Sequence, residues 1–247
     1  MSVQSPNQSL ILLLRQVDER QARLNQLKPW PGRAAERLWA GLLPDWIAGS
    51  NAIDGSRLTR DETEQLLAES GLFVDHSLRE HLDVLNQRQA IEEIRRLAAG
   101  KNPLRAATAR KIHALLIAGI DDQSAGVYRK RLLEGESRGV AEQMREWEMW
   151  VAGPACALHP IERSAVAHHQ LLRIQPFSDA NGKVARLIMN LSLLHDGYLP
   201  AILRYEDRHD YRQALHFANQ KVYAPLVELV ARSVDRIQRL YLLVLES

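Results

Sequence analysis

The chain has 247 residues, of which 46% are hydrophobic and 25% are charged, so it can bury a core as one large domain or two small ones, and its composition is neither disordered nor collagen-like. Its one cysteine, Cys156, excludes an intramolecular disulfide framework and a Cys-rich metal site, and favours a reducing compartment. The formal net charge of +2 argues against a nucleic-acid partner, and the lack of a signal sequence or membrane-length apolar run predicts a cytoplasmic protein with no membrane contact.

Apolar residues recur at helical spacing along nearly the whole chain, which predicts an all-α fold. A Lys-Pro-Trp-Pro-Gly break ends the first predicted helix, and Pro44 interrupts the second. Gly71 ends a third, which starts at a capping box formed by Thr59 and Glu62. The predicted helices cover residues 10–27, 38 onward, 59–71, 75–99, 106–118, 141–151, 161–174, 183–195, 207–220 and 226–245.

Residues 121–139 lack this helical periodicity. Gly126, Gly135 and Gly139 bracket two short apolar segments there, a pattern that predicts a small β-hairpin. Residues 100–103 form a seam in the helical pattern, but no linker-like stretch separates the two halves. We therefore expect one compact unit.

The loop at residues 175–182 is followed by Lys183, Arg186 and Asn190, which share one face of a predicted helix. Two cations in the first turn of a helix are disfavoured by about 0.3–1 kcal/mol each, because the helix N-terminus is itself positive. This placement favours an oxyanion or phosphate site, with Asp179 as a magnesium ligand. The pattern alone leaves open a simpler interpretation, in which Asn181 is an N-cap, Asp179 a turn residue, and the cations a solvated face.

The same segment resembles the signature of the Fic (Fido) family, His-Pro-Phe-x-Asp/Glu-Gly-Asn-Gly-Arg-x-x-Arg. Residues 175–186 read Gln-Pro-Phe-Ser-Asp-Ala-Asn-Gly-Lys-Val-Ala-Arg, and the likeness extends over roughly residues 100–235. Residues 50–55, Ser-Asn-Ala-Ile-Asp-Gly, resemble the family's inhibitory motif, Ser/Thr-x-x-x-Glu-Gly/Asn. The resemblance implies a helical Fic fold with a small β-hairpin flap. It also implies an N-terminal helical region at 1–100 that carries the inhibitory motif and packs with a Fic domain at 101–247.

Family members transfer AMP from magnesium-ATP to a hydroxyl of a protein target, so the resemblance implies Mg²⁺ and ATP as cofactors. It implies a metal-ligand role for Asp179 and nucleotide-binding roles for Asn181, Gly182, Lys183, Arg186 and Asn190.

Gln175 stands where the family has its histidine general base, and a primary amide cannot accept a hydroxyl proton near neutral pH. Loss of a positioned base costs typically about 10²–10⁴ in rate, so we expect transfer to be impaired. Ala180 replaces a glycine, which matters if the backbone there has a positive φ. Lys183 replaces an arginine, which keeps the charge but loses the planar fork that grips two phosphate oxygens.

The inhibitory-type motif provides Ser50, Asp54 and Gly55 as regulatory residues. In inhibited family members the motif glutamate pairs with the second signature arginine, so the resemblance implies a contact between Asp54 and Arg186. The simpler alternative is a turn at Asp54 and Gly55 with Ser50 as a helix cap.

Three functions follow from these residues. The first is a Fic-type protein that binds magnesium-ATP or another nucleotide at residues 175–186 while AMP transfer is weak or lost. The second is an active adenylyltransferase with a base other than histidine. The third is a nucleotide-independent interaction or regulatory module. A protein target or regulatory partner fits all three, and self-association is left open.

Overall fold

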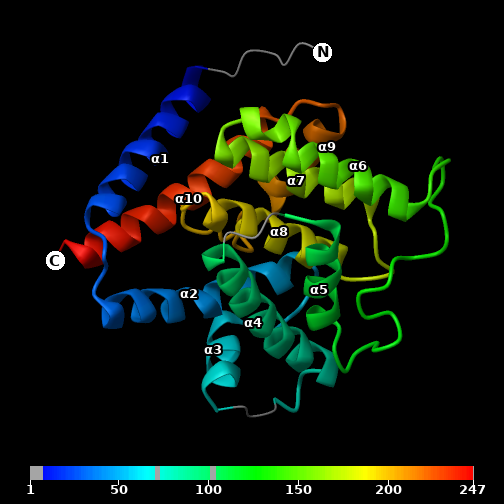
Figure 1. The fold of residues 1–247 in the computed structure, drawn as a ribbon. Helices are drawn as coiled ribbons and strands as arrows, with labels where there is room; N and C mark the ends of the chain where they lie inside the picture. The colour runs from blue at the N-terminus through cyan, green and yellow to red at the C-terminus, as the bar shows by residue number, and fades with distance from the viewer. Residues whose placement is uncertain (1–7, 70–72, 101–103, 247) are drawn as a thin grey trace.

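The computed structural model describes residues 8–69, 73–100 and 104–246, and all regular secondary structure in this part of the chain is helical (Figure 1). The elements in chain order are α1 (Gln8–Gln26), α2 (Gly32–Ile53), α3 (Arg60–Glu69), α4 (Leu78–Ala99), α5 (Ala106–Leu116), α6 (Val140–Ala152), the 3-10 turn η1 (Pro154–Ala157), α7 (Pro160–Ile174), α8 (Asn181–His195), α9 (Arg208–Asn219) and α10 (Ala224–Leu245). The predicted all-α class is correct.

Helix α8 is the centre of the molecule. It packs against α7 on one side and against α4 and α5 on the other, and Figure 1 shows it between α7 and α4. Its residues from Lys183 to Leu193 are all buried, which explains why this stretch is mostly apolar. Its polar residues are Lys183, Arg186, Asn190 and Ser192. The site described below lies at the N-terminal end of this buried helix.

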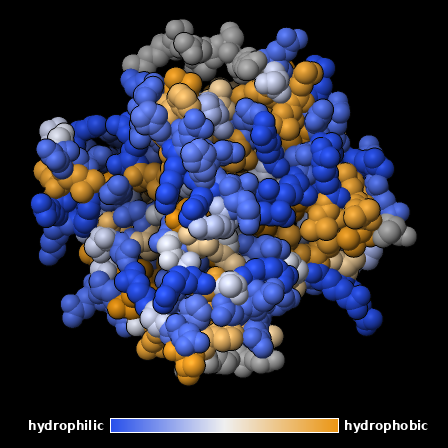
Figure 2. Space-filling view, turned by 180° about the vertical axis from the view of Figure 1, so that it is seen from behind, coloured by the Kyte–Doolittle hydropathy of each residue, from blue (hydrophilic) through white to orange (hydrophobic). Residues whose placement is uncertain are grey.

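Two apolar clusters stabilise this arrangement. The larger one joins α2, α4 and α5 to α6, α7 and α8, so its side chains come from both sides of residue 100. The smaller one joins α1 and α10 to α7, α8 and α9. The surface is mostly hydrophilic and carries separate apolar patches (Figure 2). No helix within the described ranges combines the length and the apolar character that crossing a membrane requires.

The predicted interruption at Pro44 is wrong, because α2 runs through it to Ile53. Proline removes one helical hydrogen bond, but Leu42, Trp46 and Ile47 are buried on both sides of it and hold the helix together. The continuation matters for the site, since it carries Ser50 into the last turn of the helix. The capping box before α3 is present, with Thr59 and Glu62 bonding each other's backbone N–H groups at 2.8 and 3.2 Å. The predicted stop at Gly71 lies outside the described residues.

The predicted β-hairpin at residues 121–139 is also wrong. This segment consists of turns and bends, and none of the described residues is in a strand. The N–H of Arg129 donates to the carbonyl of Pro176 at 3.0 Å, and its guanidinium binds the carbonyls of Ile174 and Gln175. Because the Arg129 N–H is satisfied by the Pro176 carbonyl, it is not available to a neighbouring strand. The segment is an irregular loop fastened to the loop before α8.

Candidate functional site

The loop between α7 and α8 makes two sharp turns at residues with positive φ. Gln175 ends α7 with φ 44° and ψ 63°, and Ala180 precedes α8 with φ 55° and ψ 14°. A left-handed conformation costs about 1–2 kcal/mol for a residue with a Cβ, so both positions carry some strain. No side chain caps the N-terminus of α8. The backbone N–H groups of its first turn are therefore available to an anion.

Asn181 and Phe177 keep the loop in shape. The Asn181 side chain accepts from the Phe177 N–H at 3.0 Å and donates to the Phe177 carbonyl at 2.8 Å. The Phe177 ring stacks on His113 of α5 with the ring centroids 3.9 Å apart. Asn181 is the first residue of α8 and not the N-cap considered from the sequence.

Arg186 is held by the end of α2. Its Nε donates to Ser50 Oγ at 2.9 Å, and its Nη2 donates to the Ser50 carbonyl at 3.1 Å and to Asp54 Oδ2 at 2.6 Å. The guanidinium is 4% exposed and the Asp54 carboxylate 34%. Burial lowers the pKa of Arg186, but Asp54 and Tyr211 outweigh that effect and raise it, so the group stays charged. The predicted contact between Asp54 and Arg186 is thus present, and one methylene fewer than glutamate does not prevent it.

Two glycines permit this contact. A Cβ on Gly182 would lie 3.0 Å from Arg186 Nη1 and 3.1 Å from Asp54 Oδ1, so a side chain at this position would crowd the pair. Gly55 has φ +102°, which lets the chain turn directly after Asp54.

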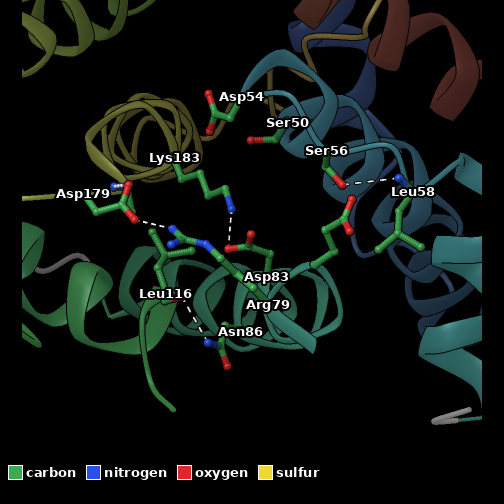
Figure 3. A network of polar contacts seen from close by, with 12 residues as sticks. Ser50, Asp54, Ser56, Leu58, Arg79, Asp83, Asn86, Leu116, Asp179 and Lys183 are labelled. Atoms are coloured by element: carbon green, nitrogen blue, oxygen red, sulfur yellow. Dashed lines mark hydrogen bonds and ion pairs between the residues drawn. The ribbon is translucent and has the colours of Figure 1, made fainter. Parts of the chain in front are cut away.

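Lys183 contacts a different element. Its Nζ lies 2.6 Å from Asp83 Oδ1 of α4, and the two side chains are 9% and 16% exposed. Figure 3 shows Lys183 extending from α8 toward Asp83 of α4. Its ammonium therefore has a carboxylate partner in this state.

Asp179 contacts Arg79, also from α4, and the two side chains are about half exposed. Burial raises the pKa of Asp179, but Arg79 and the Ala180 N–H outweigh that effect and hold it below its usual value. Within the described part of the chain, no three His, Cys, Asp or Glu side chains gather to hold a metal. Asp179 is a single hard ligand, and Mg²⁺ would need phosphate and water oxygens beside it.

Asn190 lies two turns into α8 and is 1% exposed. Its amide donates to the carbonyls of Arg186 and Ala201 and accepts from the Ala201 N–H at 2.7 Å. These bonds fix residue 201 against α8.

Gln175 is exposed at the end of α7, and no nearby histidine replaces the missing base. His168 is fully buried, and its Nε2 lies 2.8 Å from Tyr211 Oη. Burial and the charge of Arg186 lower the pKa of His168 to about 3. Burial also lowers the pKa of His113 to about 4, and its Nδ1 accepts from the Gly126 N–H. Both rings are neutral and enclosed at pH 7, so neither can take a proton from a target at the loop.

The sequence analysis missed Arg79, Asp83 and Tyr211 as partners of the site. Arg79 and Asp83 are four residues apart with opposite charges, as are Asp179 and Lys183. This spacing is a usable signal only once α4 and α8 are known to be neighbours, and that contact depends on the tertiary fold.

The helical fold is that of Fic-like proteins. The sequence pattern of the Fic/DOC family matches residues 103–193. Protein adenylyltransferase Fic of Nematostella vectensis is 31% identical over 204 residues, which cover 79% of this chain and 48% of that protein. Protein adenylyltransferase fic-1 of Caenorhabditis elegans is 32% identical over 199 residues, which cover 76% and 39%.

Solved structures agree with these relatives. A fragment of Fic-1 from C. elegans superposes with a TM-score of 0.84 at 28% identity, over 94% of this chain and 71% of that one. A Fic domain containing signaling protein from Bacteroides thetaiotaomicron shares the fold, with a TM-score of 0.83 at 23% identity over 95% and 98%. The chain belongs to the Fic/DOC family. It spans about half the length, or less, of the curated relatives it matches.

Proposed function

We propose that this Fic/DOC-family chain binds ATP, or another nucleotide, together with Mg²⁺ at residues 175–190, and that transfer of AMP to a protein hydroxyl is weak or lost. The observation that supports binding best is the burial of two cations at the uncapped start of α8. The side chains of Lys183 and Arg186 are 9% and 4% exposed, and each forms an ion pair with a carboxylate from another element. Phosphate oxygens are a natural replacement for those carboxylates.

Asp179 would hold the Mg²⁺ at this site. A magnesium ion needs only one or two carboxylates when phosphate oxygens complete its shell, and Asp179 lies at the entrance of the loop. Arg79 now contacts that carboxylate, but an ion pair that is half exposed is weak and can be replaced. When bound, the metal would neutralise part of the phosphate charge. Asn181 and Gly182 would form the backbone anion hole beside Lys183 and Arg186. Asn190, whose amide fixes residue 201, would border the nucleotide.

The proposed impairment rests on Gln175. Its amide cannot accept a proton, and the neutral, enclosed rings of His113 and His168 offer no substitute. The partner that this chemistry requires is a protein that carries the accepting hydroxyl. The cytoplasmic location and the division at residue 100 stay predictions, and self-association stays open.

The test is binding followed by restoration of the base. At a ligand concentration one hundred times Kd, magnesium-ATP adds about 2.7 kcal/mol, or about 5–11 °C in melting temperature for a chain of this size. Q175H is then expected to gain transfer of label from [α-³²P]ATP to proteins of a lysate, and Q175H/D179A is expected to lose it. No shift at several millimolar ATP would refute the binding proposal.

One observation favours a second candidate, a nucleotide-independent interaction module. Lys183 and Arg186 of α8 already pair with the carboxylates of Asp83 and Asp54, so their charges are balanced without a bound anion. That function predicts no response to nucleotide and a stable partner protein that binds D179A as tightly as the wild type.

A further inference from the structure

Helix α4 presents two side chains of opposite charge to the site, and each pairs with a site residue of the other sign. Arg79 contacts Asp179, and Asp83 contacts Lys183 (Figure 3). Residues four apart on a helix lie on one face, so one face of α4 supplies both contacts. This face therefore engages the proposed metal ligand and one of the two proposed phosphate cations.

The two contacts differ in strength. Arg79 and Asp179 are 56% and 52% exposed, so solvent screens their attraction. Lys183 and Asp83 are 9% and 16% exposed, and the Asp83 carboxylate is more enclosed than that of Asp54, which is 34% exposed. A lysine ammonium is a compact point charge, and the carboxylate of Asp83 at 2.6 Å balances most of that charge. A phosphate that approached Lys183 would have to displace Asp83 or lie beside its negative charge.

Helix α4 is also fastened next to the inhibitory-type motif. Its capping box joins Ser77 and Glu80, and Glu80 Oε1 also accepts from the Arg57 N–H at 3.2 Å. Arg57 lies three residues after Asp54. The start of α4 and the segment after Asp54 are thus tied together, while Asp83 and Asp54 engage different cations.

We propose that α4 is a second closing element of the site, in which Asp83 holds the ammonium of Lys183 away from phosphate and Arg79 covers Asp179. The proposal rests on the proposed nucleotide binding and extends it. A polyphosphate must replace the carboxylate of Asp83 as well as that of Asp54. Removal of the Asp83 charge is therefore expected to raise affinity even when Asp54 is intact.

The test is calorimetric titration of D54N, D83N and the double variant with magnesium-ATP and, in EDTA, with sodium tripolyphosphate. D83N is expected to raise the affinity for both ligands at least about fivefold, the lower end of typical coupling between sites, and the double variant is expected to exceed either single one. The matched control is E36Q, which removes the carboxylate of another pair with α4, that between Arg95 and Glu36, away from the site. E36Q is expected to bind as the wild type does.

If D54N raises the affinity and D83N does not, the second closing element is refuted and the proposed nucleotide binding stands. If no variant binds either ligand, both proposals fall. Should D83N fail to fold, the wild type still gives an answer through hydrogen exchange. Saturating tripolyphosphate is expected to speed the exchange of amides at residues 79–87, and unchanged or slower exchange would overturn the proposal.

Discussion

The contact between Asp54 and Arg186 makes two opposite predictions for the variant D54N. Without ligand the variant is expected to be less stable, because a guanidinium that is 4% exposed loses the charge of the Asp54 carboxylate and keeps its bonds to Ser50. Breaking a fully buried pair costs about 3–5 kcal/mol. Asp54 is 34% exposed, so we expect about 1–3 kcal/mol, or a melting temperature about 2–12 °C lower. In the wild type, ATP must break the contact between Asp54 and Arg186 before its phosphate can bind Arg186. D54N removes this cost of about 1–3 kcal/mol, which corresponds to about 5- to 150-fold higher affinity for ATP.

Thermal melts without ligand and calorimetric titration with magnesium-ATP measure the two effects. The matched control is D196N at the other end of α8, where Asp196 pairs with Arg163 and both side chains are 16–18% exposed. D196N is expected to lose stability and to bind ATP as the wild type does. If D54N binds ATP no better than D196N, the interpretation of Asp54 as an inhibitory residue is wrong, even if D54N is less stable.

Two further predictions concern stability. As the pH falls through 6.5 the unfolded chain protonates its histidines, whereas folded His113 and His168 stay neutral down to about pH 4 and 3. The free energy of unfolding is therefore expected to fall as the pH decreases, by about 2 kcal/mol per histidine between pH 7 and 5. Urea denaturation at pH 7 and 5 measures this, and equal midpoints would contradict the pKa assignment. A180G is expected to leave the free energy of unfolding unchanged or to raise it by up to about 1 kcal/mol. Glycine removes the left-handed strain at φ 55°, but it also makes the unfolded chain more flexible, and the two effects oppose each other. A loss above about 1 kcal/mol in the same assay would show that no such strain exists.

Local patterns in the sequence predicted most of the helices. Apolar spacing predicted them because each helix buries one face, and the box at Thr59 and Glu62 acts through bonds only three residues apart. The errors arose where distant contacts override local preference. Pro44 stays helical because Trp46 and Ile47 are buried in the core. Arg129 is not in a hairpin, and its backbone N–H donates instead to the carbonyl of Pro176 in the loop before α8.

In the candidate site too, some contacts could be predicted from the sequence and others depend on the tertiary fold. The spacing from Ser50 to Asp54 did not by itself predict the contact with Arg186. The resemblance of this segment to the inhibitory motif of the Fic family implied that contact, and the structure contains it. Nothing comparable pointed to Arg79 or Asp83. Their partners lie about one hundred residues away, and only the packing of α4 on α8 brings them together.

The burial of Arg186 and Lys183 bears on the choice between nucleotide binding and a purely structural role. A buried ion pair contributes little net stability, because desolvation of the two charges offsets most of their attraction, and apolar residues of similar size often stabilise a fold more. Stability alone therefore does not account for two enclosed cations in the first two turns of α8, where the helix dipole disfavours them further. Gly182 adds to this reasoning, because it keeps space beside Arg186 that a side chain would fill. A site that binds an anion and releases Asp54 and Asp83 in exchange gives a reason to bury two cations at the start of a helix, whereas net stability gives none.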